Sequence, residues 1–245
     1  MYKTIAVLTL LCLAVPAAMT GAAPNPLQIL KDVDAFRNPF NGFEVDIKLK
    51  SFSNEHETDT WDLKVSGRDG DKSLVEFVSP AIEKGKYLLM LRDAMWIYLP
   101  NTSRPLRISP LQRLMGDASN GDVARSNYAT DYDAAISGEE TVEGEKALVL
   151  ELTAKDGEIS YSRIRLWVRA SDYRPIQAEY YATSGKLLKR AFFRTYSNVN
   201  GRPVIQEVDI HDVVRPGRRT VMTYSNLHAR DVPDKFFNKS YLGRW

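Results

Sequence analysis

The sequence contains a single cysteine, Cys12, and lacks the residue patterns that catalysis or metal binding requires. Cys12 lies in an apolar N-terminal run, so a chain without this run has no thiol, no disulfide and no cysteine ligand. The three histidines, His56, His211 and His228, have no second histidine or cysteine at zinc-ligand spacing. The G-x-S-x-G motif of many hydrolases does not occur in the sequence. We therefore expect a protein without metal or cofactor that is not an enzyme.

An excess of charge of one sign is also missing. The chain has 33 Lys and Arg against 31 Asp and Glu, a formal net charge of +2 at pH 7. Nucleic-acid-binding domains need a strong basic excess, so we expect no nucleic-acid partner. Beyond the N-terminal run, no apolar stretch is long enough to span a membrane as a helix.

The first residues have the composition of a secretory signal peptide. Lys3 provides the positive charge, residues 4–15 form a short apolar run, and residues 16–23 are mostly small. We expect cleavage after Ala22, because a cut one residue later would place Pro24 at the scissile bond.

The sequence next to the cysteine argues against a lipid-anchored form. A lipoprotein signal needs a small residue directly before its cysteine, whereas Leu11 precedes Cys12. Export without disulfides is typical of a bacterial periplasm. We therefore expect residues 1–22 to be a signal peptide and residues 23–245 to form one periplasmic domain.

A helix is expected at the start of the mature chain. Asn25 is a favourable N-cap and Pro26 suits the first helical position. The helix should end by Asn38, because Pro39 disfavours helical geometry in the residue before it. Its apolar residues recur at three-residue steps: Leu27, Leu30, Val33 and Phe36.

After this helix, apolar and polar residues alternate with the period of β-strands. A turn is expected over residues 67–72 and another over residues 92–94. The predicted strands are residues 43–49, 61–65, 73–78, 87–91, 95–99, 147–153, 163–168, 175–182, 187–196, 204–213 and 220–226. This pattern predicts a mainly β protein with ten or eleven antiparallel strands in a single large sheet or barrel.

Residues 110–128 interrupt the strand pattern. Pro110 can start a short helix that carries Leu111, Leu114 and Met115, and Ser119 or Asn120 can cap a second one. We expect these short helices to cover one face of the sheet. The first should act as a lid over a cavity, since one helical turn needs a partner surface for its apolar side chains.

Two groups of charged residues have open interpretations. The acidic pairs Asp131 with Asp133 and Glu139 with Glu140 lie in loop-like sequence, where solvated turn carboxylates are the simplest interpretation. Three arginines cluster before and within the lid segment and would suit a phosphate or a lipid headgroup, or else be solvated: Arg104, Arg107 and Arg113.

Large apolar side chains on several predicted strands indicate an interior cavity. A large curved sheet with only short helices to cover it leaves an apolar hollow that can hold an apolar ligand. From their alternation, eight residues are expected to line one cavity: Trp61, Leu63, Leu89, Leu91, Trp96, Tyr98, Leu166 and Val168.

Two segments carry a family resemblance. MWIYLP at residues 95–100, Arg104, RIS at residues 107–109 and LMGDASNGDV at residues 114–123 resemble the outer membrane lipoprotein-sorting proteins of the LolA-like superfamily. The C-terminal element of these proteins is similar as well, here Pro233, Asp234, Phe237, Tyr241 and Leu242. The resemblance implies an unclosed antiparallel β-barrel, lined with apolar side chains and capped by helices, that shields acyl chains in transit across the periplasm.

Three functional hypotheses follow. The first is a monomeric periplasmic carrier that binds the acyl chains of lipoproteins or other lipids and moves them towards the outer membrane. Its partners would be envelope membrane proteins, as a donor exporter or an acceptor. The second is a lipid-sensing or adaptor domain of an envelope export system, and the third is an envelope hydrolase.

Overall fold

The computed structural model describes residues 24–92, 94–102, 104–124, 127–156 and 159–242. The predicted signal peptide lies outside these residues. Within the described ranges, no helix combines the length and the apolar character needed to cross a membrane.

Helix α1 (Pro26–Arg37) begins and ends as its sequence predicts. The side chain of Asn25 accepts hydrogen bonds from two backbone N–H groups of the first turn, and the N–H of Asn38 donates to Asp34 at the last. Of the apolar residues that recur at three-residue steps, Leu27 is not buried but 46% exposed. The buried face of the helix consists of Ile29, Leu30 and Val33.

The rest of the chain is mainly antiparallel β-structure, as predicted, with more strands than the ten or eleven expected. The strands are β1 (Gly42–Ser53), β2 (His56–Arg68), β3 (Lys72–Ser79), β4 (Tyr87–Leu91), β5 (Ala94–Tyr98), β6 (Leu106–Ile108), β7 (Arg113–Met115), β8 (Ala118–Ser119), β9 (Tyr132–Val142), β10 (Glu145–Ala154), β11 (Arg163–Arg169), β12 (Pro175–Tyr181), β13 (Leu187–Val199), β14 (Arg202–Asp212) and β15 (Arg218–Ala229). Thirteen of them form one sheet in the order β6-β5-β4-β3-β2-β1-β15-β14-β13-β12-β11-β10-β9. Strands β6 and β9 are its two edges, so the sheet is not closed.

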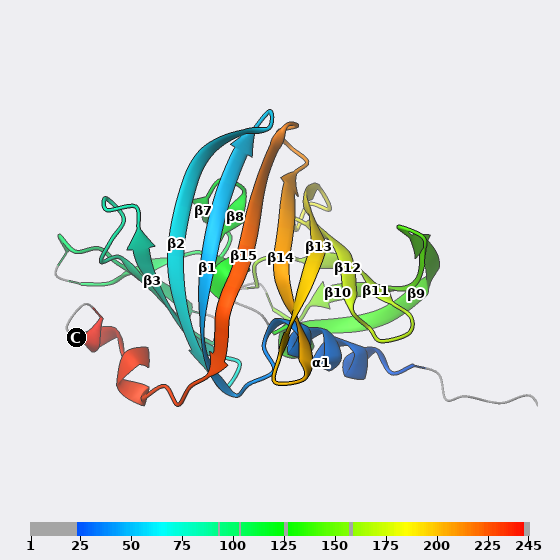
Figure 1. Cartoon of the computed structure of the whole chain (residues 1–245), viewed down its shortest axis with the longest axis horizontal. Coiled ribbons are helices and arrows are strands. Elements are labelled where there is room, and N and C mark those ends of the chain that lie inside the picture. The colour runs from blue at the N-terminus through cyan, green and yellow to red at the C-terminus, as the bar shows by residue number, and fades with distance from the viewer. Residues whose placement is uncertain (1–23, 93, 103, 125–126, 157–158, 243–245) are drawn as a thin grey trace, which may run out of the picture.

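The first and last strands meet at the centre of this sheet. β1 pairs antiparallel with β15, with Leu49 opposite Met222 and Ile47 opposite Tyr224. On either side of this pair, sequence neighbours follow one another as hairpins out to β6 and to β9. Figure 1 shows the long strands curving together, with α1 crossing one end of β13 and β14.

The segment predicted as a lid helix is instead a β-hairpin. Strand β7 turns back at Gly116, whose φ of 55° lies in the left-handed region, and pairs with β8. A residue in that conformation ends a helix, so the apolar residues of this segment belong to a ribbon. The second predicted helix is present as α2 (Asn120–Ala124), and a third short helix, α3 (Tyr128–Asp131), follows it.

The acidic sequence expected to form loops is largely the edge strand β9. Asp133, Glu139 and Glu140 all lie in this strand. Most of its side chains are exposed or half-buried, so apolar residues do not alternate along it as they do in a strand with one buried face.

Two hydrophobic clusters occupy opposite faces of the sheet. The larger lies on the inner face and includes α1, the hairpin, α2 and α3. The smaller lies on the outer face of β3–β5, where the C-terminal segment with η1 (Asp234–Phe237) and η2 (Lys239–Tyr241) covers it. Its buried members are Leu74, Leu89, Val232, Phe237 and Leu242.

Candidate functional site

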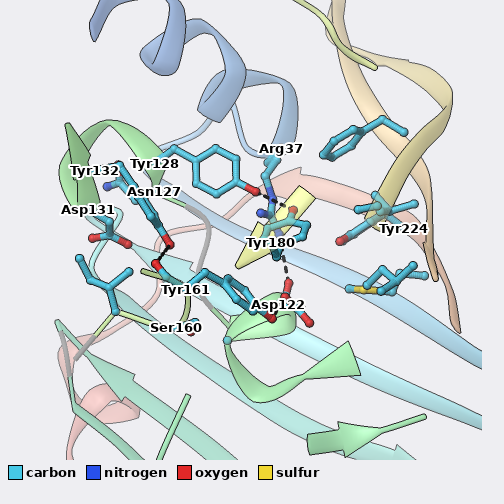
Figure 2. A pocket seen from close by; sticks show the side chains of 17 residues that line it. Arg37, Asp122, Asn127, Tyr128, Asp131, Tyr132, Ser160, Tyr161, Tyr180 and Tyr224 are labelled. Carbon is cyan, nitrogen blue, oxygen red and sulfur yellow. Dashed lines mark hydrogen bonds between the residues drawn. The ribbon is translucent and has the colours of Figure 1, made fainter. Parts of the chain in front are cut away.

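A cavity of about 50 Å³ lies between the inner face of the sheet and the segments that cover it (Figure 2). This cover consists of α1, the β7–β8 hairpin, α2 and α3. The apolar wall of the cavity comes from β13, β14 and β15 through Ala191, Phe193, Val208, Ile210 and Met222. Its polar wall (Figure 2) carries a guanidinium, five phenols and two carboxylates: Arg37, Tyr128, Tyr132, Tyr161, Tyr180, Tyr224, Asp122 and Asp131. A buried water needs roughly 10–15 Å³, so this space suits a few waters or one small polar group.

A second cavity of about 40 Å³ adjoins the first. Arg37 and Tyr224 line both, so they form the boundary between the two. The remaining walls of the second cavity are mostly apolar and come from β1, β2, β14 and α2: Phe43, Val45, Ile47, Val65, Val123, Ala124 and Ile205. The interior thus offers apolar surface on both sides of one cation.

Arg37 is held at this boundary from the last turn of α1. Its guanidinium donates to the backbone oxygen of Asp122 at 3.0 Å, and Tyr224 lines both cavities with it. It also lies over the ring of Tyr128, 5.9 Å from the centroid. Among the described residues, no carboxylate forms an ion pair with it.

The phenols form hydrogen bonds along the polar wall. The hydroxyls of Tyr128 and Tyr180 are 2.9 Å apart, and Tyr132 donates to the backbone oxygen of Tyr161 at 3.1 Å. Burial raises the pKa of Tyr128, Tyr161, Tyr180 and Tyr224 above the ordinary value. These phenols therefore stay protonated and neutral at physiological pH.

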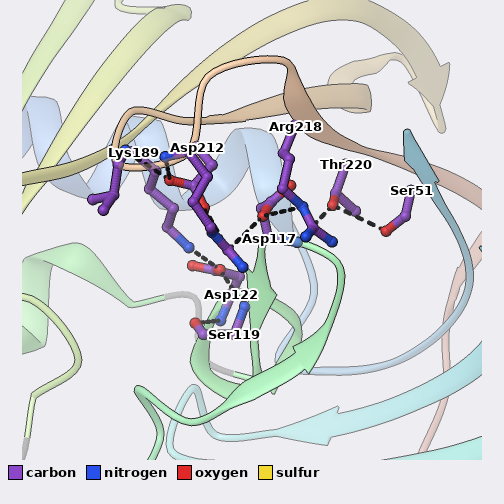
Figure 3. Close-up of polar contacts among 10 residues, drawn as sticks. Ser51, Asp117, Ser119, Asp122, Lys189, Asp212, Arg218 and Thr220 are labelled. Atoms are coloured by element: carbon purple, nitrogen blue, oxygen red, sulfur yellow. Dashed lines mark hydrogen bonds and ion pairs between the residues drawn. The ribbon is translucent and has the colours of Figure 1, made fainter. Parts of the chain in front are cut away.

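At the end of this polar wall, an ion pair between two side chains holds α2 on the sheet (Figure 3). Asp122 of α2 forms an ion pair with Lys189 of β13, and both side chains are less than a tenth exposed. Asp122 also accepts from the hydroxyl of Tyr161 at 2.9 Å and from the N–H of Ser119 at 2.7 Å. Because the Ser119 hydroxyl accepts in turn from the N–H of Asp122, these two residues form a reciprocal cap on α2.

The tip of the β7–β8 hairpin docks on the centre of the sheet. The N–H of Asp117 donates to the hydroxyl of Thr220 at 2.8 Å, and Ser51 lies beside it. The Asp117 carboxylate pairs with Arg215 at 3.0 Å. Burial and the neighbouring carboxylate of Asp212 raise the pKa of Asp117. The hairpin is therefore fixed through polar contacts, while its apolar residues face the core.

An open groove of about 380 Å³ lies outside this polar network. Leu111, Leu188 and Val214 give it apolar surface, and its cations are Arg113, Lys189 and Arg215. Tyr161 lines both this groove and the first cavity. The side chains that hold the hairpin and α2 in place therefore separate the interior from the surface.

The structure does not bring the predicted cavity residues together. Leu63, Leu166 and Val168 lie in the inner cluster and Trp61 packs against it. The assignment of the other four to the same cavity is wrong: Leu89, Leu91, Trp96 and Tyr98 belong to the outer cluster. Both faces of β4 and β5 are apolar because the C-terminal segment covers the outer one, so alternation alone could not choose between them.

Two of the three predicted lid residues pack in or against the inner cluster. Met115 is buried in the inner cluster and Leu114 packs against it, whereas Leu111 is 48% exposed. The arginines at 104, 107 and 113 are exposed, and of these Arg113 lines the open groove. Contact of any of these residues with a ligand remains a prediction.

Sequence reasoning missed the polar wall, although two of its residues carry a signal. Arg37 continues the buried stripe of α1, four residues after Val33. Lys189 shares the inward parity of Ala191 and Phe193 on β13. A charged residue at a core position of a periodic pattern is the observable sign of a buried polar site. The tyrosines give no comparable sign, because they come together only in the fold.

The described residues include no group of three or more His, Cys, Asp and Glu side chains arranged to hold a metal ion. The side chains that line the first cavity provide an apolar wall that faces a guanidinium and neutral phenols. Such a site suits a molecule with one apolar and one polar end.

Comparisons with known proteins point to one fold. A family model described only as an uncharacterized protein matches residues 69–244. The chain is similar to a LolA superfamily protein from Nitrosomonas europaea, with 34% identity and a TM-score of 0.85 over 90% of this chain and 100% of that one. No curated protein matches the sequence.

Two further solved structures agree. A DUF1329 family protein from Desulfovibrio piger is 28% identical, with a TM-score of 0.75 over 88% of this chain and 97% of that one. A domain from Vibrio parahaemolyticus, assigned as an outer membrane lipoprotein-sorting protein, is 23% identical. Its TM-score is 0.75 over 89% of this chain and 98% of that one, a likeness of fold alone.

Proposed function

The chain belongs to the LolA superfamily, and from this we propose that it is a non-enzymatic carrier of lipid acyl chains. It takes up the acyl chains of a lipid or lipoprotein between the inner face of its sheet and the helical cover. It then carries them through the periplasm towards the outer membrane.

The observation that supports this proposal most is the apolar interior on both sides of Arg37. The walls of the two cavities come from the long central strands and from α2, so an acyl chain lying along them would contact β1, β2 and β13–β15. Each methylene moved out of water contributes about 0.8 kcal/mol, which favours binding of long chains without any specific contact.

Uptake requires the cover to move. Cavities of about 50 and 40 Å³ do not admit an acyl chain, so under this proposal the structure corresponds to the closed form of the carrier. The parts of the cover nearest the open groove are the hairpin and α2, which is one short turn of five residues. They pack on the sheet through buried apolar side chains, Met115 and Val123 among them, and through a small number of polar contacts, and their displacement would join the groove to the interior.

Native mass spectrometry of protein recovered from the periplasm tests the binding step. We expect copurified lipid or acylated peptide, and binding of the neutral dye Nile red by protein from which the lipid has been extracted. Extracted protein that binds neither Nile red nor dodecanol would contradict the proposal. Transfer of a pyrene-labelled phospholipid from loaded protein to acceptor vesicles separates a carrier from a sensor, which would retain its lipid.

A pair of alanine variants locates the binding site. Ala191→Leu fills the first cavity and should weaken Nile red binding about tenfold, because the added side chain occupies the space of the ligand. Ala147→Leu is the matched control, since Ala147 is equally buried but lies in a separate cluster with Trp167. Both variants add volume to a close-packed site and should cost about 1–3 kcal/mol of stability. Equal loss of binding in both variants would place the ligand elsewhere.

A further inference from the structure

Arg37 is a cation in the interior whose charge the described residues leave without a direct carboxylate partner. Building on the proposed carrier function, we propose that Arg37 pairs with the anionic headgroup of the bound amphiphile, a carboxylate or a phosphate monoester. The ligand class is then an acidic lipid whose chain lies on the apolar wall and whose head lies at the boundary of the two cavities.

The nearby carboxylates are engaged elsewhere. Asp34, one turn before Arg37 on α1, accepts the backbone N–H groups of Tyr128 and Ala129 at 2.8 and 2.9 Å. The carboxylate of Asp122 pairs with Lys189, so only its backbone oxygen contacts Arg37. Asp131 also lines the first cavity and opposes the binding of an anion there, which limits the affinity without removing the preference.

Neutral hydrogen-bond groups surround the position proposed for the headgroup. The phenols of Tyr128, Tyr180 and Tyr224 keep their protons because burial raises their pKa, so they can donate to a headgroup oxygen without adding negative charge. Ser160 lines the same cavity, is 8% exposed, and its hydroxyl has no hydrogen-bond partner among the described residues. An oxygen-rich headgroup would satisfy that hydroxyl.

The apolar surfaces on both sides of Arg37 fit the rest of such a molecule. Phe193, Val208 and Met222 line one side, and Val45 and Val65 line the other. A chain that leaves the headgroup in either direction therefore remains in apolar contact. A neutral lipid would gain the same contacts but would leave the guanidinium unpaired, which is costly in a partly desolvated site.

Displacement of Nile red by three ligands that share one chain tests the proposal. These ligands are dodecanoic acid, dodecyl phosphate and dodecanol, each used below its micelle concentration. We expect the two anions to bind about tenfold more tightly than the alcohol, as a charge-assisted hydrogen bond predicts. The order of the two anions distinguishes a carboxylate ligand from a phosphate ligand.

Substitutions at Arg37 connect this preference to one side chain. Arg37→Met should reduce binding of the preferred anion about tenfold and leave dodecanol within about twofold, whereas Arg37→Lys should keep most of the preference. Lys31→Met is the control, because it removes a cation from the exposed face of the same helix. If Arg37→Met does not fold, Tyr224→Phe provides the second test, since it removes a neutral donor that lines both cavities with Arg37 and should reduce the preference.

The outcomes separate this inference from the function on which it rests. Equal affinity of wild-type protein for the acid, the phosphate and the alcohol would overturn the headgroup site and leave the carrier function standing. A preference that persists unchanged in Arg37→Met and in Tyr224→Phe would also overturn it. Failure to bind any of the three ligands would contradict the carrier function itself.

Discussion

Asp122 and Lys189 form a buried ion pair that joins the helical cover to the sheet. Their side chains are 9% and 7% exposed, and they come from α2 and β13. Burial opposes ionisation of the Asp122 carboxyl, but the attraction and hydrogen bond of Lys189 together with the hydrogen bonds of Ser119 hold its pKa below the usual range. The carboxylate therefore stays ionised at physiological pH, and the ion pair holds α2 on the sheet.

Removing one member of this pair should destabilise the protein strongly. Asp122→Asn leaves the Lys189 ammonium buried and unpaired, and we expect a loss of about 3–5 kcal/mol in the free energy of unfolding. Urea denaturation measures this change. Glu57→Gln breaks the exposed pair with Lys50 and should change the free energy of unfolding far less, because solvent screens that pair. Similar costs for the two variants would show that the buried pair does not hold the cover.

The hairpin tip should be sensitive to a single methyl group. Gly116 has a φ of 55°, and a Cβ there would lie 1.8 Å from the hydroxyl oxygen of Ser51 and 2.4 Å from that of Thr220. Gly116→Ala should therefore both strain the turn and push the hairpin off the sheet. Gly144 also has a positive φ, but a Cβ there would meet nothing within 4 Å. Gly144→Ala therefore measures the backbone strain alone, about 1 kcal/mol. Denaturation should show a larger loss for Gly116→Ala, and equal losses would contradict the docked tip.

The pH dependence of stability should carry a contribution from Asp34. Burial raises the pKa of this carboxyl from 3.8 to about 7, against the lowering effect of the N–H groups of Ala129 and Tyr128. Between these values the folded state binds a proton that the unfolded state has lost, so the free energy of unfolding falls as the pH rises. Below the unfolded pKa the contribution is fully present, and above about pH 7 it is absent.

The measurement for Asp34 is the stability difference between wild type and Asp34→Asn across this window. The difference should decline from about pH 4 to about pH 7, by an amount on the order of a few kcal/mol, and then stay constant. Asp69→Asn serves as the control. The hydrogen bond from Lys72 lowers the pKa of the exposed Asp69, so its contribution should be flat over the same window. A flat profile for Asp34 would show that the carboxylate is ionised throughout.

The cover should affect ligand binding through Leu114. This side chain packs against the inner cluster from β7, and an aspartate there would place a carboxylate at an apolar contact. Leu114→Asp should weaken Nile red binding several-fold with a modest fall in melting temperature, since the hairpin is peripheral. Leu111→Asp changes a half-exposed residue of the same segment and should leave binding unchanged. An unfolded Leu114→Asp protein would make this segment core, and unchanged binding would reject the lid interpretation.

Helix caps and apolar alternation predicted the elements whose conformation is set mainly by neighbouring residues. Asn25, Pro26 and Asn38 set the ends of α1, and the alternation of Phe43 to Leu49 places β1 correctly. The same reasoning failed for residues 110–116, because spacing of apolar residues suits a helical turn and a short ribbon equally, and the conformation of Gly116 decides between them. It also failed for β9, an edge strand whose exposed side chains leave no alternation to detect.

The candidate site was harder to predict than the fold, because it depends on contacts between distant segments. Trp96 and Tyr98 alternate along β5 as cavity residues would, but the C-terminal segment covers their face, with Phe237 and Leu242 buried against it. Nothing near Trp96 in the sequence indicates that cover. Tyr128, Tyr180 and Tyr224 come from three separate elements, and they line one cavity with Arg37 only in the folded sheet.

Because β1 pairs with β15, the sheet can be completed only late in the synthesis of the chain. The strands on each side can form from hairpins between sequence neighbours, but the central pair must wait until residues near the C-terminus have emerged. Until then β1 and β14 are open edges, and closing so long a loop is slow. A chain broken off before Arg218 would keep both edges exposed at the centre of its two half-sheets, where they could pair with other chains and aggregate.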